Sequence, residues 1–356
     1  MNHTTESHRG FFHTRVPLWL AFVVAAVATL VILFIVRSAL HLTASSVPVE
    51  TAPVAVDCDL KIQQHRVKGQ KLTSPLLFVD VTAESDKLND VKSSVQSIIE
   101  RQKCEGAINS ASVYVKVWGN GEWFSINPDE SFYTASLMKV AVLITILKMS
   151  ENIPGYLDRN YPFRYADPHI APQTFRGMTI IPGRDYKIRD LLYYMIVYSD
   201  NYASNVLNNL MDLNTYTRLF ADVGIEGYDP QDQFRKMKAS DVGKLFRVLF
   251  NSSYLNESNS EFALSLLAQS SFSEGLVKEL PQDVTVAHKF GEGGGTDENQ
   301  LSEGGIVYLG KTPYLIVVMT RGKQLKDLTQ SVSEISKEVY NYLASHINQN
   351  SAMASL

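Results

Sequence analysis

A serine and a lysine stand three residues apart at the start of an apolar stretch, FYTASLMKVAVLITILK. In a helix, Ser136 and Lys139 would lie one turn apart on the same face. A lysine that burial keeps neutral can accept the proton of a serine hydroxyl, which would make Ser136 a nucleophile. The competing interpretation is structural, because a capping serine followed by a lysine that reaches solvent is a common arrangement. The pair alone does not decide between them.

Two later stretches add further polar side chains. In YSDNYASN, Ser199 and Asn201 stand at a break between two helical patterns. In AHKFGEGGGT, Lys289 and Gly291 stand at the end of an expected strand, before a run of glycines. The order Ser-x-x-Lys, Ser-Asp-Asn and Lys-x-Gly resembles the motif set of the class A β-lactamases and penicillin-binding proteins. The resemblance covers roughly residues 86–345 and includes the sequence leading to each motif, GEWFSINPDESFYTASLMKV, GMTIIPGRDYKIRDLLYYMIVYSDN and VAHKFGEGGGT.

The resemblance implies a role for each catalytic side chain. Ser136 would be the acylated nucleophile, and Lys139 would be the base or proton relay beside it. Ser199 would pass a proton to the leaving nitrogen. Asn201 would bind an amide of the substrate and brace Lys139. The backbone N–H groups of Ser136 and Glu292 would form the oxyanion hole.

The third motif is assigned to substrate binding through Lys289 and Gly291. Lys289 would face a substrate carboxylate and, as a like charge, help to keep the amine of Lys139 neutral. Phe290 departs from the family pattern, which has a threonine or serine there that offers a hydroxyl to that carboxylate. Thr296, in the following loop, is the candidate to replace this hydroxyl. The departure predicts changed specificity with unchanged chemistry.

A second departure concerns the water that hydrolyses an acyl-enzyme. The β-lactamases carry a Glu-x-x-Leu-Asn loop between the second and third motifs, and its glutamate activates that water. This sequence has no such loop, and the nearest imitation, LMDLN at residues 210–214, continues a helical pattern. Glu226, Asp229 and Asp232 lie in the short connection that follows, but none has the required sequence context. The resemblance therefore predicts ready acylation and slow deacylation.

The elements around these motifs indicate one mixed domain. Residues 112–126 and 304–320 alternate in hydrophobicity around a turn, as β-hairpins do, and residues 284–290 form another expected strand. Apolar residues recur at helical spacing from Leu328 to Leu343, while residues 136–275 are mostly helical in pattern. We therefore expect an α/β (α+β) fold with an antiparallel sheet, terminal helices that cover it and an inserted helical lobe. The resemblance implies five strands in the sheet and an active site between sheet and lobe.

Residues 16–36 form an uncharged apolar stretch that, as a helix, would be about 31 Å long and would cross a bilayer. Arg9 and Arg15 precede it and only Arg37 follows closely, which favours a cytoplasmic N-terminus at residues 1–15. A cleaved signal peptide is the alternative, but the stretch is longer than the usual apolar region of one. We expect a tether at 37–56, a pre-domain segment at 57–85, the hydrolase domain at 86–348 and a tail at 349–356, all periplasmic or at the cell surface.

The composition excludes some partners. A formal net charge of -4, without a block of lysine and arginine, argues against nucleic acid. No histidines and cysteines have the spacing of a metal site, and we expect neither a metal nor a cofactor. Cys58 and Cys104 would either form a disulfide in the exported domain or remain as two buried thiols, because spacing alone does not show proximity. The oligomeric state has no signal in the sequence.

Three function classes follow from these observations. The first is a membrane-anchored serine acyl-enzyme that acts on β-lactam amides or on the D-Ala-D-Ala stem peptides of peptidoglycan. The second is a true class A β-lactamase with a relocated water activator. The third is a non-catalytic protein that binds peptidoglycan, which the complete polar set disfavours because a retired site has no reason to keep a buried amine at a desolvation cost. We expect the first, because the water-activating glutamate is missing.

Overall fold

The computed structural model describes residues 62–67, 69, 72–170, 174–175, 177–225, 236–295 and 297–353 of the chain. These residues belong to one unit, Asp59–Leu356. The expected membrane-crossing stretch at 16–36, the tether at 37–56 and Cys58 lie outside the described residues. Within the described ranges, no helix is long and apolar enough to cross a membrane. Cys104 is exposed at the end of a helix rather than buried.

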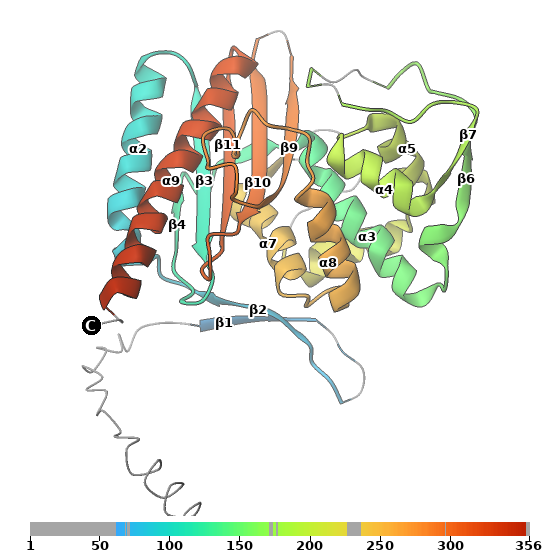
Figure 1. The fold of residues 1–356 in the computed structure, drawn as a ribbon, viewed down its shortest axis with the longest axis horizontal. Helices are drawn as coiled ribbons and strands as arrows, with labels where there is room; N and C mark the ends of the chain where they lie inside the picture. Colours follow the sequence, from blue (N-terminus) through green and yellow to red (C-terminus); the bar gives the residue numbers. More distant parts are fainter. Residues whose placement is uncertain are drawn as a thin grey trace, which may run out of the picture. The chain divides into compact units, whose positions relative to one another are not determined.

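A five-stranded antiparallel sheet forms the middle layer of the domain (Figure 1). From edge to edge its strands are β4 (Trp123–Ile126), β3 (Ser110–Val117), β11 (Tyr314–Gly322), β10 (Asn299–Val307) and β9 (Val286–Gly294). The hairpins predicted at 112–126 and 304–320 are β3 with β4 and β10 with β11, and the strand predicted at 284–290 is the first part of β9. Because β9 is an edge strand, one of its sides remains available to other segments of the chain.

Two helices cover one face of this sheet. After the 3₁₀ turn η1 (Asp86–Leu88), helix α2 (Asn89–Cys104) packs against α9 (Leu325–Met353), and the two lie side by side in Figure 1. The apolar stripe predicted from Leu328 to Leu343 is confirmed, because all of its apolar positions are buried. These side chains form one core cluster with the facing residues of the sheet. Burial of this stripe is what holds the C-terminal helix on the sheet.

A helical lobe covers the other face and forms a second core cluster with it. Its helices are α3 (Lys139–Asn152), α4 (Ile188–Val197), α5 (Asn201–Leu210), α6 (Leu213–Asp222), α7 (Ala239–Phe250) and α8 (Glu257–Leu267), with the 3₁₀ turn η3 (Tyr156–Asp158) after α3. Helix α3 is surrounded by protein, because every residue from Val140 to Leu147 is buried. This central position explains why its sequence is apolar on all sides.

The region predicted to be mostly helical also contains short strands. β6 (Asn160–Phe163) pairs with β7 (Arg184–Lys187), and β8 (Lys236–Lys238) pairs with β5 (Ser131–Tyr133). Strands of three or four residues show too little alternation to be distinguished from loops in a sequence. The β5 to β8 pairing matters for the site, because β5 leads directly into the turn that carries Ser136.

A hairpin of two antiparallel strands packs on the domain. Its strands are β1 (Ile62–Arg66) and β2 (Leu76–Val81), and Leu77 and Phe78 are buried. Asp80 Oδ1 lies 2.6 Å from Nη1 of the buried Arg247 on α7. Because a buried guanidinium needs a charged partner, this ion pair fixes the hairpin to the helical lobe. The described part of the segment predicted at 57–85 is therefore integrated with the domain that follows it.

Candidate active site

Ser136 lies in a 3₁₀ turn, η2 (Ala135–Met138), between β5 and α3. The sequence predicted a helix N-terminus at this serine, but the α-helix begins at Lys139 because the 3₁₀ turn precedes it. Ala135 has a φ of 47°, which is uncommon for a residue with a Cβ atom. Such a conformation persists only where the surrounding structure fixes it, and functional turns are typical places. The turn presents a half-buried Ser136 side chain.

Lys139 is buried beside the second motif. Its side chain donates hydrogen bonds to Asn201 Oδ1 at 2.7 Å, to Ser199 Oγ at 3.3 Å and to the Ser199 carbonyl oxygen. Burial lowers the pKa of Lys139 to about 7, against opposing effects of the nearby Asp200 and Glu292. Near neutral pH, a large share of the molecules therefore carry an unprotonated amine that can accept a proton. The predicted bracing of Lys139 by Asn201 matches this contact.

The second motif is held in place by its aspartate. Asp200 caps α5 by accepting two backbone N–H groups of the first turn, and it also accepts a hydrogen bond from Thr179 Oγ1 at 2.8 Å. Ser199, immediately before it, is fully buried and has a φ of 56°. These contacts fix the Ser199 side chain within hydrogen-bond reach of the amines of Lys139 and Lys289.

Lys289 is fully buried on β9. Its Nζ donates to Ser199 Oγ and to the Phe290 carbonyl oxygen, both at 2.8 Å, and lies 4.2 Å from the centre of the Phe290 ring. Burial, and then the positive charge of Lys139, hold the pKa of Lys289 well below its ordinary value. The sequence predicted the reverse effect, of Lys289 on Lys139, but burial alone is what lowers the pKa of Lys139. The contact with a substrate carboxylate stays a prediction, since the amine is buried here and donates to Ser199 Oγ.

Gly291 brings the edge strand against the nucleophile turn. A Cβ atom on this residue would lie 2.2 Å from the Thr134 carbonyl oxygen, 2.7 Å from Leu137 N and 3.0 Å from Ser136 N. Real Cβ atoms do not approach backbone atoms so closely, so only glycine allows this packing. The close approach places the backbones of β9 and Ser136 side by side, which is what an oxyanion hole shared by Ser136 and Glu292 requires.

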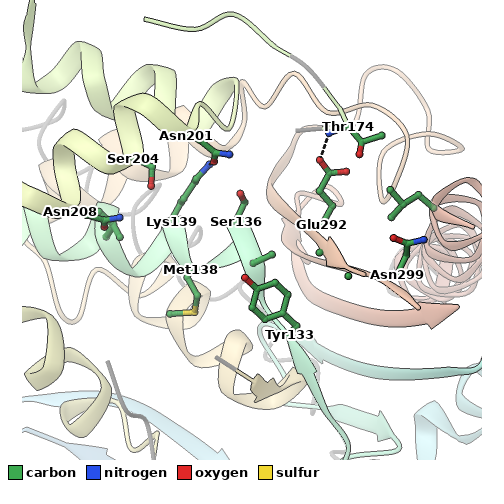
Figure 2. A pocket seen from close by; sticks show the side chains of 15 residues that line it. Tyr133, Ser136, Met138, Lys139, Thr174, Asn201, Ser204, Asn208, Glu292 and Asn299 are labelled. Carbon is green, nitrogen blue, oxygen red and sulfur yellow. Dashed lines mark hydrogen bonds between the residues drawn. The ribbon is translucent and has the colours of Figure 1, made fainter. Parts of the chain in front are cut away.

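A cavity of about 530 Å³ opens at Ser136, between α3 and α5 on one side and β9 on the other (Figure 2). Four of the predicted site residues line it: Ser136, Lys139, Asn201 and Glu292. Three more lie behind its wall, namely Ser199, Lys289 and Gly291. Thr296 lies outside the described residues, as do the candidate water activators Glu226, Asp229 and Asp232.

Other lining residues had not been predicted: Tyr133, Ala135, Met138, Val142, Thr174, Ser204, Asn208, Gly293, Gly294, Asn299 and Leu325. Ser204 and Asn208 had a usable signal, because they follow Asn201 at steps that keep them on one face of a helix. Thr174 and Leu325 had none, since they come from segments that only the fold brings to the site.

The side chain of Glu292 is the least expected part of this wall. The sequence had assigned only its backbone N–H, but its carboxylate lines the cavity, and Figure 2 shows it across Ser136 from Lys139 and Asn201. Oε1 accepts a hydrogen bond from the Thr174 N–H at 2.6 Å. Oε2 is buried and has no hydrogen-bond partner in the part of the chain that the structure describes. A buried carboxylate oxygen in that state requires a donor from outside these residues.

The profile of the Beta-lactamase enzyme family matches residues 90–343. The chain belongs to this family. It is accordingly an enzyme, a serine hydrolase, with the α/β fold and the five-stranded sheet described above. Among curated proteins, β-lactamase L2 of Stenotrophomonas maltophilia is 40% identical over 81 residues, which make up 22% of this chain and 25% of that enzyme. The match thus spans a quarter of that relative's length.

Solved structures show the same fold. A mutant of PBP-A, in an acyl-enzyme complex with penicillin G, has a TM-score of 0.61 and 20% identity over 72% of this chain and 97% of that one. A β-lactamase from Chitinophaga pinensis has a TM-score of 0.63 and 20% identity over 72% of this chain and 100% of that one. At these identities, the likeness concerns the fold alone.

Phe290 departs from the β-lactamase motif, and the structure shows which side chains surround its ring. Phe290 is buried, its ring stacks on Phe272 with centroids 4.0 Å apart, and Phe175 packs edge-on at 5.9 Å. An apolar cluster therefore stands where the family motif has a hydroxyl. Among the described residues, no three histidine, cysteine, aspartate or glutamate side chains lie together as a metal site requires.

Proposed function

We propose that this β-lactamase-family enzyme forms an acyl-enzyme at Ser136 with β-lactam amides or D-Ala-D-Ala peptides, and that it releases the acyl group slowly. The observation that carries the proposal is the buried Lys139, which contacts both Ser199 and Asn201 and has a pKa of about 7. A charged lysine with these contacts would stabilise the fold only; an amine that is largely neutral near pH 7 can take the proton of a nucleophile.

Acylation uses groups that the site holds ready. Ser136 Oγ attacks the amide carbonyl carbon while its proton moves to Lys139 Nζ, and the backbone N–H groups of Ser136 and Glu292 stabilise the oxyanion. The carbonyl then re-forms and the bond between carbon and nitrogen breaks. Ser199 Oγ gives its proton to the leaving nitrogen and regains one from an adjacent lysine amine, which lies 2.8 or 3.3 Å away. The products are an ester on Ser136 and a free amine.

Deacylation needs a water molecule with a base of its own. Among the described residues that line the cavity, Glu292 is the one carboxylate, and it lies across Ser136 from Lys139 (Figure 2). Its Oε1 is held by the Thr174 N–H at the outer end of the site. The sequence lacks the Glu-x-x-Leu-Asn loop, and no carboxylate of the described residues lines the cavity on the side of Lys139 and Asn201. General-base assistance is worth about 10² to 10⁴ in rate, so its loss makes the ester persist.

A second candidate is a true β-lactamase, and one observation favours it. Glu292 lines the cavity, and its buried Oε2 has no hydrogen-bond partner among the described residues, so a side-chain rotation would let this carboxylate bind a water molecule near the ester. If Glu292 activated this water, the enzyme would turn over penicillins and the Ser136 ester would not accumulate.

An intact-mass time course of the purified protein with benzylpenicillin tests both candidates. Our proposal expects a covalent adduct, absent from Ser136→Ala, that maps to Ser136 and persists after free penicillin is removed. Rapid hydrolysis of many equivalents without an accumulating adduct would contradict it. In that case Glu292→Gln identifies the activator: a longer adduct lifetime, by about 10² or more, would assign the role to Glu292.

A further inference from the structure

The cavity wall formed by β9 offers no positive charge to a ligand. Among the described lining residues, the charged side chains are Lys139 and Glu292. The amine of Lys139 is engaged with Ser199 and Asn201 on the opposite wall. Lys289 has no exposed surface and donates to Ser199 Oγ and to a backbone carbonyl. A carboxylate placed against β9 would therefore find no cation on this wall.

The described residues of β9 also carry no hydroxyl that could bind a carboxylate. Phe290 fills the position, and its stack with Phe272 is buried, so water and polar ligand groups are excluded from that volume. The buried aromatic cluster behind this wall lowers the local dielectric constant near a ligand group. Desolvation strengthens any remaining charge interaction, whether attractive or repulsive.

The charged side chain next to such a ligand group is Glu292. The neighbouring glycines face the nucleophile turn: a Cβ on Gly291 would strike Thr134, and one on Gly293 would lie 2.4 Å from the Tyr133 ring. Because side chains alternate along a strand, Glu292 points to the other face of β9, the face that Phe290 also uses. Glu292 and Phe290 thus share one face of β9, where the Glu292 carboxylate lines the cavity beside the backbone proposed to bind the oxyanion and Phe290 is buried next to it.

The hydrogen bonding of Glu292 indicates which chemical group this subsite binds. Oε1 is satisfied by the Thr174 N–H, whereas the buried Oε2 has no partner among the described residues. Leaving a charged acceptor unsatisfied is costly, and an N–H donor that is itself charged is the strongest available partner. An ammonium group satisfies both the hydrogen bond and the charge. A carboxylate satisfies neither.

We propose that the subsite lined by Glu292 and Thr174 selects substrates that carry an ammonium group, rather than a carboxylate, next to the scissile amide. The inference rests on the proposed acyl-enzyme at Ser136 and narrows its substrates: penicillins and D-Ala-D-Ala peptides carry a carboxylate at this place, so they should react more slowly than cationic analogues. Substrates of this class are amides or peptides whose leaving portion bears a free amine. Lys323 and Lys326 flank the lining residue Leu325 in sequence, but both are exposed and neither lines the cavity, so solvent screens their opposing effect.

Three compounds with the same ring and acyl side chain test the charge preference: benzylpenicillin, its neutral methyl amide and its cationic aminoethyl amide. The second-order rate of acylation is measured for each by intact mass. With the wild-type protein, we expect the cationic amide to react faster than benzylpenicillin by at least about tenfold, the factor that corresponds to about 1.4 kcal/mol. Glu292→Gln keeps the shape and the acceptor for Thr174 but removes the charge, so this preference should disappear.

Glu298→Gln is the matched control. Glu298 lies close to the same strand pair, accepts a hydrogen bond from Asn109 Nδ2 at 2.9 Å and does not line the cavity. This variant should keep the wild-type preference, because the same chemical change is made outside the subsite. A preference that disappears equally in both variants would overturn the assignment to Glu292, as would equal rates for all three compounds with the wild-type protein.

A binding measurement separates this inference from the proposed function. Ser136→Ala cannot form the ester, so the affinities of the cationic amide and of benzylpenicillin for this variant report the subsite alone. We expect tighter binding of the cationic amide, and loss of the difference in the double variant with Glu292→Gln. Equal affinities, or no measurable affinity for the cationic amide, would overturn the subsite even if Ser136 is acylated. The expected difference in binding without any acylation of the wild-type protein would instead overturn the proposed function and leave the subsite standing.

Discussion

Lys289 Nζ donates a hydrogen bond to Ser199 Oγ at 2.8 Å, although 90 residues separate them in the sequence. The contact joins the edge strand of the sheet to the loop before α5 in the helical lobe. Ser199 Oγ also accepts a hydrogen bond from Lys139 at 3.3 Å. A proton that Ser199 loses to a leaving group can therefore be replaced from either wall of the site. The proposed proton relay therefore requires that the sheet and the helical lobe be packed together, because each contributes one of its lysines.

The role of Lys139 as proton acceptor can be tested by two substitutions. Lys139→Met keeps a long apolar stem without an amine, and Lys139→Arg keeps a charge that guanidinium does not release. Both should lower the rate of Ser136 acylation by about 10² to 10⁴, as measured by intact mass with a penicillin. Lys148→Met is the control on the same helix, because Lys148 binds Glu151 and the Tyr254 carbonyl outside the cavity. Acylation of either Lys139 variant within a few-fold of wild type would refute the role.

The rate of acylation should depend on pH through the same lysine. Only the unprotonated amine accepts a proton, and the pKa of Lys139 is lowered by burial to about 7. The rate should therefore rise with pH, by about tenfold between pH 6 and the plateau above pH 8, because one proton must leave. A penicillin whose own charge is constant over this range gives a clean profile. A rate that is flat from pH 6 to 9, or that falls as pH rises, would mean that a neutral Lys139 is not required.

The packing of β9 on the nucleophile turn predicts that a single added methyl group greatly lowers the rate of acylation. Gly291→Ala should displace the strand, because its Cβ would lie 2.2 Å from the Thr134 carbonyl oxygen. Displacement by about 1 Å can cost about 10² in rate, so acylation should fall by at least that factor. Gly295→Ala is the control, since a Cβ there meets no atom within 4 Å and its backbone is not in the left-handed region. Thermal melting of both variants separates loss of fold from loss of alignment; wild-type acylation by Gly291→Ala would contradict the shared oxyanion hole.

The membrane anchor remains a proposal from the sequence, because residues 16–36 lie outside the described residues. From the apolar length and the arginines before it, we propose that the hydrolase domain lies outside the cytoplasm. Protease added to cells with a permeable outer layer should remove the domain while a cytoplasmic marker stays intact. N-terminal sequencing of the membrane-bound chain should find residues 16–36 retained. Protection of the domain, or a chain that begins after residue 36, would contradict the anchor.

Much of the fold followed from local patterns. Gly119 and Gly121 predict the β3 to β4 turn, because glycine adopts positive φ values without strain. Their φ values in the structure are 100° and 73°. The stripe from Leu328 to Leu343 predicts α9 because one side of that helix must be buried. The short strands β6, β7 and β8 were missed, because three or four residues of alternation carry little signal. Periodicity is informative only over elements that are long and bury one face.

The sequence by itself determined the candidate catalytic side chains, because Ser136, Lys139 and Ser199 occur in ordered motifs whose spacing is local. Only the tertiary structure decided what those side chains face. Lys289 is a charged residue in the sequence, yet the fold buries it against Ser199 and removes it from the cavity wall. For Glu292 the sequence predicted only a role of the backbone N–H. The alternation of β9 and the hydrogen bond from Thr174 place its carboxylate on the cavity wall as a negative charge. Burial and charge environment depend on segments far apart in the chain, so no spacing rule could supply them.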